Sequence, residues 1–466
     1  MSVRTRTETI AAIATPPGAG GVGIVRVSGP EALPLLKKLF QPHRPLSTFA
    51  SHRLYYGTIF ARNGALLDEV LAVYMQAPHT YTREDVVEFQ CHASPLVLQE
   101  LLEHLFTLGA RPAEPGEFTK RAFLSGRIDL SQAEAVIDLL EARSATGAGL
   151  AASQLQGTLA YEIAGIRATL IELMAHLEVA IDFPDEDADI FDRHAARAVL
   201  QERVLDPIRR LIADADHGRI YREGARLVLA GLPNAGKSSL LNALLREERA
   251  LVTPVPGTTR DSIEEVMILG GIPVQLIDTA GIRSGQDDPV EALGVERARK
   301  MIDSADCVLF LIDAHAGFTQ ADQELHASIR HKRQLLVLNK RDLITLEQEL
   351  DLHRQLAETQ KPVVSISARS GEGMEELHRA ILELILPSQT TLGETARFAP
   401  NRRHRSLLSQ ALNAGTASLN SLNSGAPLDL LSVDLQTVLD CIGGISGHSS
   451  PEEVLDAVFS RFCIGK

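Results

Sequence analysis

Residues 231–238 read Gly-Leu-Pro-Asn-Ala-Gly-Lys-Ser, which is the G-x-x-x-x-G-K-S pattern of a phosphate-binding loop. The pattern constrains the fold because such a loop joins a buried strand to the first turn of a helix. The sequence supplies both neighbours, since an apolar run ends at Ala230 and a helical repeat follows Ser239. We therefore predict a strand, loop and helix in succession here.

Each residue type in this loop suits contact with a nucleotide. The glycines let backbone N–H groups curl around phosphates, Lys237 can reach the β and γ oxygens, and Ser238 can offer its hydroxyl to Mg²⁺. By itself the loop indicates only a nucleoside triphosphate. The expected contacts are Asn234, Ala235, Gly236, Lys237, Ser238 and Ser239.

Three further motifs follow at the ends of apolar runs, in an order that selects guanine. Asp278-Thr-Ala-Gly281 can sense the γ-phosphate and its metal. In Asn339-Lys-Arg-Asp342, the final carboxylate can accept both N–H donors of guanine, a pattern that adenine does not present, and Ser367-Ala-Arg369 can offer a backbone N–H to the guanine oxygen. We predict a Ras-like G domain. Its expected contacts include Asp278, Thr279, Ala280, Gly281, Asn339, Lys340, Asp342, Ser367, Ala368 and Arg369.

The group that positions the attacking water is less obvious. Gly257-Thr-Thr-Arg-Asp261 reads as a switch segment, in which Thr259 would reach Mg²⁺ only when a γ-phosphate is present. Ras-like enzymes place a glutamine directly after the Asp-x-x-Gly motif to orient water, but here that position is Ile282. Hydrolysis therefore needs another group or another cation. The nearby acidic candidates, each of which could equally be a solvated charge, are Asp287, Asp288 and Glu291.

Composition excludes several classes of protein. The net charge of −14 argues against a general nucleic-acid binder, because duplex affinity comes mainly from phosphate neutralisation by Lys and Arg. Tryptophan is absent, which argues against an aromatic platform for single-stranded RNA. The cysteines lack metal-ligand spacing and indicate a reducing compartment. With no apolar stretch near the ~20 residues of a membrane span, and no secretory segment at the N-terminus, we expect a cytoplasmic protein with no membrane partner.

The remaining segments differ in pattern. Residues 1–120 mix short β-like runs with helices and predict an α+β domain, whereas residues 121–218 and 387–466 carry long amphipathic helical repeats. One of these repeats predicts a single long helix from residue 150 to residue 181. Because the predicted G domain, residues 219–386, lies between the helical blocks, the simplest architecture is one helical domain interrupted by an inserted G domain.

Two local patterns suggest further sites. Gly18-Ala-Gly-Gly-Val-Gly23 looks like a dinucleotide loop, but it runs into a strand instead of opening a helix, so we reject that interpretation. Arg402-Arg-His-Arg405 is the strongest local basic patch. Such a cluster is more often a solvated helix face than an RNA contact, and both interpretations stay open.

Three segments outside the G motifs, together with those motifs, carry a family resemblance: Ala14-Thr-Pro-Pro-Gly-Ala-Gly-Gly-Val-Gly23, Tyr81-Thr-Arg-Glu-Asp-Val-Val-Glu88, and the run from Pro115-Gly-Glu-Phe-Thr-Lys-Arg to Arg127 and beyond. With the terminal Phe462-Cys-Ile-Gly-Lys466, they resemble the MnmE (TrmE) family of tRNA-modification GTPases. The resemblance implies a multidomain α/β and α+β fold with three parts: an N-terminal α+β tetrahydrofolate-binding and dimerisation domain, a discontinuous helical domain, and an inserted Ras-like P-loop G domain.

The resemblance also implies partners and a reaction. Members of the family form a homodimer and work with the FAD-dependent partner MnmG (GidA), in a heterotetramer or larger complex. Their shared substrate is C5 of the wobble uridine, position 34, of certain tRNAs. The product is an aminomethyl or carboxymethylaminomethyl uridine, and the one-carbon unit comes from 5-formyl- or methylene-tetrahydrofolate.

The resemblance further implies site residues. The folate contacts fall on Arg26, Glu88, Arg127 and Lys466, where a carboxylate can pair with the pterin N–H edge and cations can face the glutamate tail. A potassium site maps to Asn234, Thr253, Val255 and Thr258, and the threonines at 253, 258 and 259 also border GTP. A cation beside the phosphates can replace an arginine finger. The catalytic residues are Lys237 and Glu291, the latter positioning water, and the family's terminal cysteine corresponds to Cys463.

Two other functions use part of the same sequence. A ribosome-assembly switch of the Era or Der type would keep the G domain but would carry a basic RNA-binding module, whereas the flanks here are helical in a strongly acidic chain. A stand-alone folate-dependent one-carbon transferase would leave the GTPase motifs unexplained.

Overall fold

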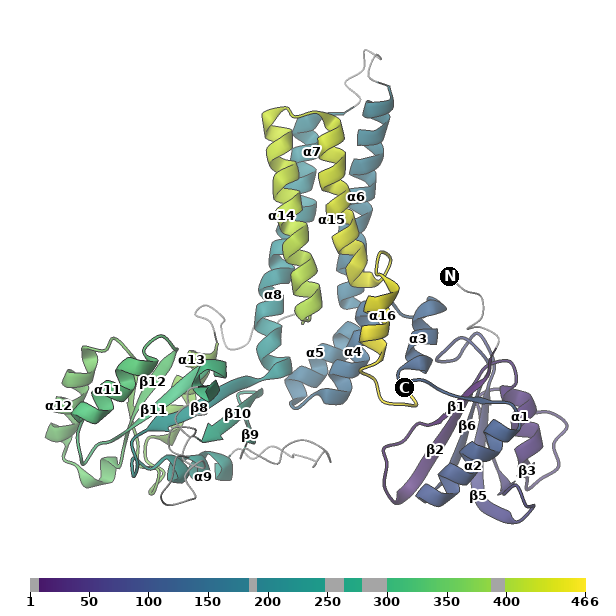
Figure 1. The fold of residues 1–466 in the computed structure, drawn as a ribbon, viewed down its shortest axis with the longest axis horizontal. Coiled ribbons are helices and arrows are strands. Elements are labelled where there is room, and N and C mark those ends of the chain that lie inside the picture. Colours follow the sequence, from purple (N-terminus) through teal and green to yellow (C-terminus); the bar gives the residue numbers. More distant parts are fainter. Residues whose placement is uncertain (1–7, 184–190, 248–263, 279–299, 387–398) are drawn as a thin grey trace. The chain divides into compact units, whose positions relative to one another are not determined.

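The computed structural model describes residues 8–183, 191–247, 264–278, 300–386 and 399–466 (Figure 1). Its internal contacts divide the chain into two compact units. Unit 1 comprises Met1–Ile137, Gln154–Leu205 and Leu407–Lys466, and unit 2 comprises Asp138–Ser153 and Asp206–Ser406. Each unit is therefore assembled from segments that lie far apart in the sequence.

Unit 1 contains a seven-stranded sheet in the order β3-β4-β5-β6-β2-β1-β7. All neighbours are antiparallel except the parallel pair β1 and β7. Alternate side chains of the strands form a buried core with helices α1 (Ala32–Leu39) and α2 (Pro95–Thr107). The strands are β1 (Ile10–Ile13), β2 (Gly20–Ser28), β3 (Phe40–Pro42), β4 (Arg53–Phe60), β5 (Leu66–Met75), β6 (Val86–Ala93) and β7 (Arg111–Pro112).

Strand β2 shows which structure the glycine-rich pattern at residues 18–23 adopts. The last residues of that pattern form the start of the strand, and no helix follows them directly. The expectation that this pattern runs into a strand and does not open a helix is therefore confirmed.

Helices make up the rest of unit 1. The long helix expected from residue 150 to 181 is instead two helices, because Gly157 adopts a left-handed φ of 93° and ends the first of them. Helix α6 packs along α15, and α16 packs against α3. The helices are α3 (Glu117–Leu124), α4 (Leu130–Glu141), α6 (Thr158–Asp182), α7 (Arg193–Val199), the π-helix η2 (Leu200–Leu205), α15 (Leu428–Ser446) and α16 (Glu452–Phe459).

Unit 2 contains a six-stranded sheet in the order β13-β12-β11-β8-β10-β9, parallel except for the β9–β10 hairpin. Strands β11 and β12 are buried almost throughout, because separate apolar clusters cover both faces of the sheet. The strands are β8 (Ala225–Gly231), β9 (Glu264–Leu269), β10 (Ile272–Asp278), β11 (Cys307–Asp313), β12 (Gln334–Asn339) and β13 (Val363–Ser365).

The helices of unit 2 flank that sheet or lead into it. Helix α8 (Asp206–Glu223) runs directly to β8, and α9 (Lys237–Glu247) follows the phosphate-binding loop. Three helices, α4, α5 (Ala145–Leu155) and α14 (Arg402–Ser424), have residues in both units. The others are α11 (Gln320–Ile329), the 3-10 helix η4 (Arg341–Leu343), α12 (Leu346–Ala357) and α13 (Met374–Ile385). The predicted mixture of α+β, helical and α/β parts is confirmed.

Candidate functional site

Strand order places the phosphate-binding loop at the point where ligands bind in α/β sheets. The chain passes from β10, on one side of β8, to β11 on the other, so the strand order reverses beside β8. Ligands bind outside the carboxyl ends of parallel strands at such a switch point. Gly231 ends β8 there, Asp278 ends β10 and Asn339 ends β12, so three of the predicted motifs meet at one edge of the sheet.

Two glycines of the loop occupy positions that other residues cannot take. Gly231 has a φ of 149°, and a Cβ on it would collide with the carbonyl oxygen of Leu311 on the neighbouring strand. Gly236 has a φ of 95°, and a Cβ there would collide with the side-chain amide of Asn339. Both therefore have to be glycine for the backbone to curl closely around a phosphate.

Lys237 begins α9 and carries the positive charge of the loop. Its Nζ donates to the carbonyl oxygens of Gly231 at 2.9 Å and of Leu232 at 2.8 Å, and the side chain is buried. Backbone carbonyls hold the ammonium group across the loop, at the N-terminus of a helix whose dipole also favours an anion. This donor set fits nucleotide phosphates, and the adjoining Ser238 would supply the Mg²⁺ ligand.

Asn339 connects the phosphate-binding loop with the base-binding loops. Its Nδ2 donates to the Ala235 carbonyl oxygen at 2.8 Å, and its Oδ1 accepts from the backbone N–H of Ala368 at 3.1 Å. The side chain is 2% exposed, so both polar ends are satisfied inside the protein. A single buried amide thus fixes the phosphate and base sites relative to one another.

Lys340 and Asp342 have different environments, although they are close in sequence. Lys340 has a left-handed φ of 66°, and its Nζ donates to Asp313 Oδ2 at 2.5 Å. Burial alone would raise the pKa of Asp313, but the hydrogen bond from Lys340 and two backbone N–H groups lowers it below its ordinary value. Asp342 is exposed beside this pair, as a carboxylate that receives a guanine base must be.

The third base-binding motif lies directly after β13. Ser367 is fully buried, and its Oγ accepts from the backbone N–H of Ser370 at 3.2 Å. The N–H of the next residue, Ala368, donates the hydrogen bond that Asn339 Oδ1 accepts. Arg369 is exposed. The predicted guanine motifs at residues 339–342 and 367–369 are therefore joined by a direct hydrogen bond.

Several predicted site residues lie outside the described residues. They belong to the switch segment, to the end of the Asp-x-x-Gly motif and to the acidic loop that follows it. They are Thr253, Val255, Thr258, Thr259, Thr279, Ala280, Gly281 and Glu291, together with Asp287 and Asp288, the other acidic candidates for positioning water. Of the predicted potassium ligands only Asn234 is described, as an exposed residue with a left-handed φ of 67°.

A second cluster of predicted site residues lies in unit 1. Arg26 on β2 and Glu88 on β6 are register partners in the sheet, and Arg26 Nε donates to Glu88 Oε1 at 2.8 Å. The same guanidinium donates to the carbonyl oxygen of Gly465 at 3.3 Å, so the C-terminal segment reaches this ion pair. Three of the four predicted folate contacts, Arg26, Glu88 and Lys466, therefore belong to one neighbourhood.

Arg127 is held by an aromatic ring. Its guanidinium lies 4.7 Å from the ring centroid of Tyr81, whose hydroxyl is 3.0 Å from Thr119 Oγ1. No contact that joins Arg127 to the Arg26–Glu88 pair appears among the described residues.

Sequence reasoning missed an ion-pair network around the buried Glu117, also in unit 1. Glu117 accepts from Arg111 at 2.6 Å and from Arg121 at 2.9 Å, and Arg121 also pairs with Glu84 at 3.0 Å. Burial opposes ionisation of Glu117, but the hydrogen bonds lower its pKa below the ordinary value. The sequence feature that could have revealed this network is the i,i+4 spacing of Glu117 and Arg121.

The basic patch at residues 402–405 pairs with acidic residues of unit 2. Arg402 pairs with Glu223 at 3.0 Å and Arg405 with Asp216 at 2.6 Å, both on α8. His404 is fully buried and accepts from the backbone N–H of Asn401. These contacts join the chain entering the G domain to the chain leaving it and favour a structural role for the patch.

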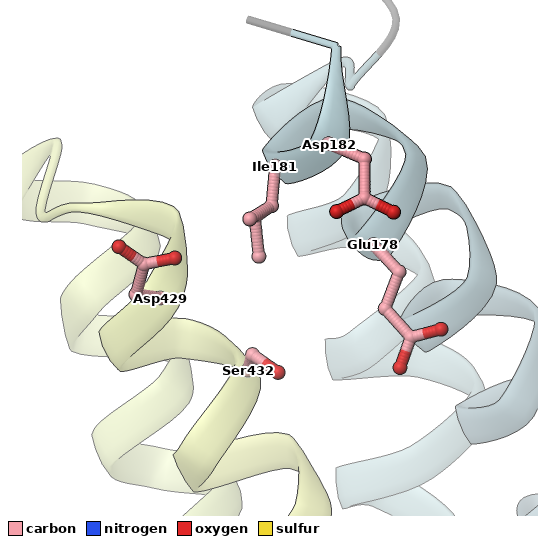
Figure 2. A pocket seen from close by; sticks show the side chains of 5 residues that line it. All are labelled: Glu178, Ile181, Asp182, Asp429 and Ser432. Carbon is pink, nitrogen blue, oxygen red and sulfur yellow. The ribbon is translucent and has the colours of Figure 1, made fainter.

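A cavity of about 380 Å³ lies between the ends of α6 and α15 (Figure 2). Three carboxylates line it, from Glu178, Asp182 and Asp429, with Ile181 and Ser432.

In the part of the chain that the structure describes, no group of three or more His, Cys, Asp or Glu could hold a metal ion. Among the described helices, none has the length and apolar character to cross a membrane.

Comparisons with known proteins cover nearly all of the chain. A family described as the MnmE helical domain matches residues 130–463, and one described as the GTP-binding protein TrmE N-terminus matches residues 9–127. The tRNA modification GTPase MnmE of Desulfotalea psychrophila is 49% identical over 98% of both chains. That of a Roseiflexus species is 45% identical over 98% of this chain and 99% of its own. A solved structure of Aquifex aeolicus Era bound to GDP.AlF4- is 27% identical, covers 41% of this chain and 66% of its own, and has a TM-score of 0.30.

Proposed function

This chain belongs to the MnmE family of tRNA modification GTPases, and from that premise we propose that it modifies C5 of the wobble uridine, position 34, of certain tRNAs. Membership makes it a GTP hydrolase that uses GTP with Mg²⁺ and acts on tRNA. In the proposed reaction the chain works with the FAD-dependent partner MnmG, and the product is an aminomethyl or carboxymethylaminomethyl uridine.

The observation that carries the folate part of this proposal is the Arg26–Glu88 ion pair and its contact with Gly465. The pair is only partly exposed, at 19% and 17% of the two side chains, so a ligand that reaches it leaves water. A carboxylate in that place can accept two N–H donors from a pterin edge, and Arg26 would keep it oriented. Lys466 and Arg127 would face the negative glutamate tail of 5-formyl- or methylene-tetrahydrofolate.

Hydrolysis of GTP needs a water-positioning group, because Ile282 occupies the place of the Ras glutamine. We assign that role to Glu291. The charge-neutralising role goes to K⁺, held by Asn234, Thr253, Val255 and Thr258 beside the phosphates. The exposure of Asn234, two residues before Gly236 in the phosphate-binding loop, supports this, since its side chain is free to reach a cation there.

An uncovered sheet face in unit 1 supports a homodimer. Leu54 and Tyr56 on β4 and Leu71 on β5 are 52%, 49% and 40% exposed, whereas the alternate residues of both strands pack under α1 and α2. Tyr56 and Leu71 are register partners, so the apolar side chains adjoin. A second copy of the chain would cover this face.

We place the homodimer and its MnmG complex in the cytoplasm.

The proposed domains follow the sequence boundaries. Residues 1–120 bind folate and dimerise, residues 121–218 and 387–466 form the helical domain, and residues 219–386 form the G domain. The two compact units combine these parts differently, since residues 138–153 and 206–218 associate with the G domain. Part of the helical block that precedes the G domain in the sequence is thereby grouped with it.

Reconstitution with an isotopic label tests the proposed function. The purified chain, MnmG, substrate tRNA, GTP and methylene-tetrahydrofolate carrying ¹³C in its one-carbon unit are incubated together, and the nucleosides are analysed by mass spectrometry. We expect one additional mass unit in the C5 substituent of the wobble uridine. An unlabelled product would contradict the folate-derived carbon, and no product with active MnmG would contradict the whole proposal.

Two variants sharpen this experiment. Glu88→Gln should abolish labelling while leaving GTP hydrolysis intact, because Glu88 lies in unit 1 and the G site lies in unit 2. Glu31→Gln is the matched control, since Glu31 is an exposed carboxylate of the same unit, directly before α1. If the product is absent and a ribosome-assembly defect accompanies loss of the gene, the Era- or Der-type switch becomes the better account.

A further inference from the structure

Arg341 is the third residue of the Asn339-Lys-Arg-Asp342 motif, and its side chain contacts two acidic residues. Its Nε donates to Glu349 Oε2 at 3.1 Å, and its NH1 group lies 3.3 Å from Glu372 Oε1. Glu349 belongs to α12, whereas Glu372 belongs to the loop that follows Ser367. One guanidinium therefore connects the Asp342 loop with the other base-binding loop and with a flanking helix.

The backbone around Arg341 strengthens the same connection. The Arg341 N–H donates to the carbonyl oxygen of Ile366 at 3.0 Å, one residue before Ser367. At the other end of that loop, the Ser367 N–H donates to the carbonyl oxygen of Glu372 at 2.9 Å. Glu372 is thus held to the loop by its backbone and to Arg341 by its side chain.

Of the two carboxylates that Arg341 contacts, Glu349 is the more firmly held. Its side chain is 12% exposed, against 56% for Glu372. The first turn of α12 is fixed by a capping box, in which the Gln348 N–H donates to Thr345 Oγ1 and the Thr345 N–H donates to Gln348 Oε1. A partly buried carboxylate on a capped helix offers a fixed point, whereas exposed ion pairs are individually weak.

Asp342 follows Arg341 directly and is exposed. It lies in the short helix η4, whose residues have no buried side chain to anchor them. Because Asp342 has to accept two N–H donors from guanine in one plane, a small rotation of η4 would weaken both hydrogen bonds. The contacts of Arg341 oppose that rotation.

We propose that Arg341 is a positioning residue for guanine specificity: through Glu349 and Glu372 it fixes the plane in which Asp342 meets the N1–H and the 2-amino group of the base. Arg341 acts through Asp342 and does not touch the base. Loss of its two contacts lowers discrimination for the 2-amino group more than it lowers binding of the phosphates.

Inosine diphosphate supplies the test, because it lacks only the 2-amino group of GDP. Dissociation constants for GDP and IDP are measured on the full-length protein and on Arg341→Met, which keeps the aliphatic stem and removes both contacts. We expect the IDP-to-GDP ratio of dissociation constants to fall about three- to tenfold. Arg341→Lys, which can reach one carboxylate, should recover part of the ratio.

A purely structural role predicts a different result. An unchanged ratio in Arg341→Met, with or without a lower melting temperature, would overturn the proposal. Arg354→Met is the matched control, since Arg354 is a 78% exposed residue of α12 whose ion pair is with Asp351 on the same helix. If Arg341→Met fails to fold, Glu372→Gln decides: a lower ratio supports the positioning role and an unchanged ratio overturns it.

Discussion

Asn339 donates from its side-chain amide to the carbonyl oxygen of Ala235, 2.8 Å away and 104 residues earlier in the chain. The other end of the amide accepts from Ala368. One buried side chain therefore sets the distance between the part of the site that receives phosphates and the part that receives the base. The nucleotide site is preorganised by this bond.

Asn339→Ala should weaken GDP binding and destabilise unit 2. The substitution leaves the Ala235 carbonyl and the Ala368 N–H without their buried partner, which costs about 1–3 kcal/mol. Calorimetric titration with GDP and a thermal melt measure the two effects. Asn420→Ala, at an exposed position of α14, is the control and should change neither. Wild-type affinity in Asn339→Ala would refute the bridging role.

Glu291→Ala should leave GTP binding nearly intact and slow hydrolysis severely. In the proposed mechanism this carboxylate orients the attacking water and touches no phosphate in the ground state, so only the transition state loses an interaction. Single-turnover hydrolysis with K⁺ as the monovalent cation is the measurement, and exchange of K⁺ for Na⁺ should also slow it. Unchanged turnover in Glu291→Ala would remove this residue from the mechanism.

Glu117 should make the stability of unit 1 depend on pH in the acid range. Its pKa in the folded protein is below the ordinary value of 4.5, so its contribution is complete above pH 4.5 and disappears as the pH falls through the folded-state pKa. At pH 7, Glu117→Gln should lower the free energy of unfolding by about 3 kcal/mol, because Arg111 and Arg121 lose a buried partner.

Denaturant titrations of wild type and Glu117→Gln between pH 7 and pH 3 test this. The difference between the two proteins should shrink as the pH is lowered, since protonated glutamate and glutamine become alike. A constant difference over the whole range would show that the network does not lower the pKa of Glu117.

One of the four cysteines should react with a thiol reagent in the folded protein. Burial raises the pKa of Cys91 to about 12 and that of Cys307 to about 11, and it also raises the pKa of Cys441. Cys463 is exposed. At pH 8 a disulfide reagent should therefore titrate one thiol quickly and all four after denaturation. The fast phase should vanish in Cys463→Ser; its persistence would mean that a buried thiol is accessible.

Local patterns predicted much of the fold. The phosphate-binding loop, the apolar runs before each G motif and the amphipathic repeats correspond to β8, β10, β12, α4 and α14. The short strands β3 and β7 have two or three residues and no periodicity of their own, so only their pairing with β4 and β1 defines them. The break at Gly157 was also missed, because a glycine in a helical repeat is compatible with either outcome.

The site was predictable where its chemistry is local. Lys237, Asn339 and Asp342 follow from motifs, because each acts within a few residues of a strand end. The partner of Arg26 at Gly465 lies 439 residues away, and no pattern in the sequence pairs them. The role of Arg341 depends on Glu349 and Glu372, which come together only when two loops and a helix pack.

The most direct measurement is mass spectrometry of nucleosides from the tRNA of cells that lack this gene, set against the parent strain and a strain complemented with the intact chain. The proposed function predicts that the C5-modified wobble uridine disappears in the deletion and returns on complementation. An unchanged nucleoside profile in the deletion strain would contradict the proposed function.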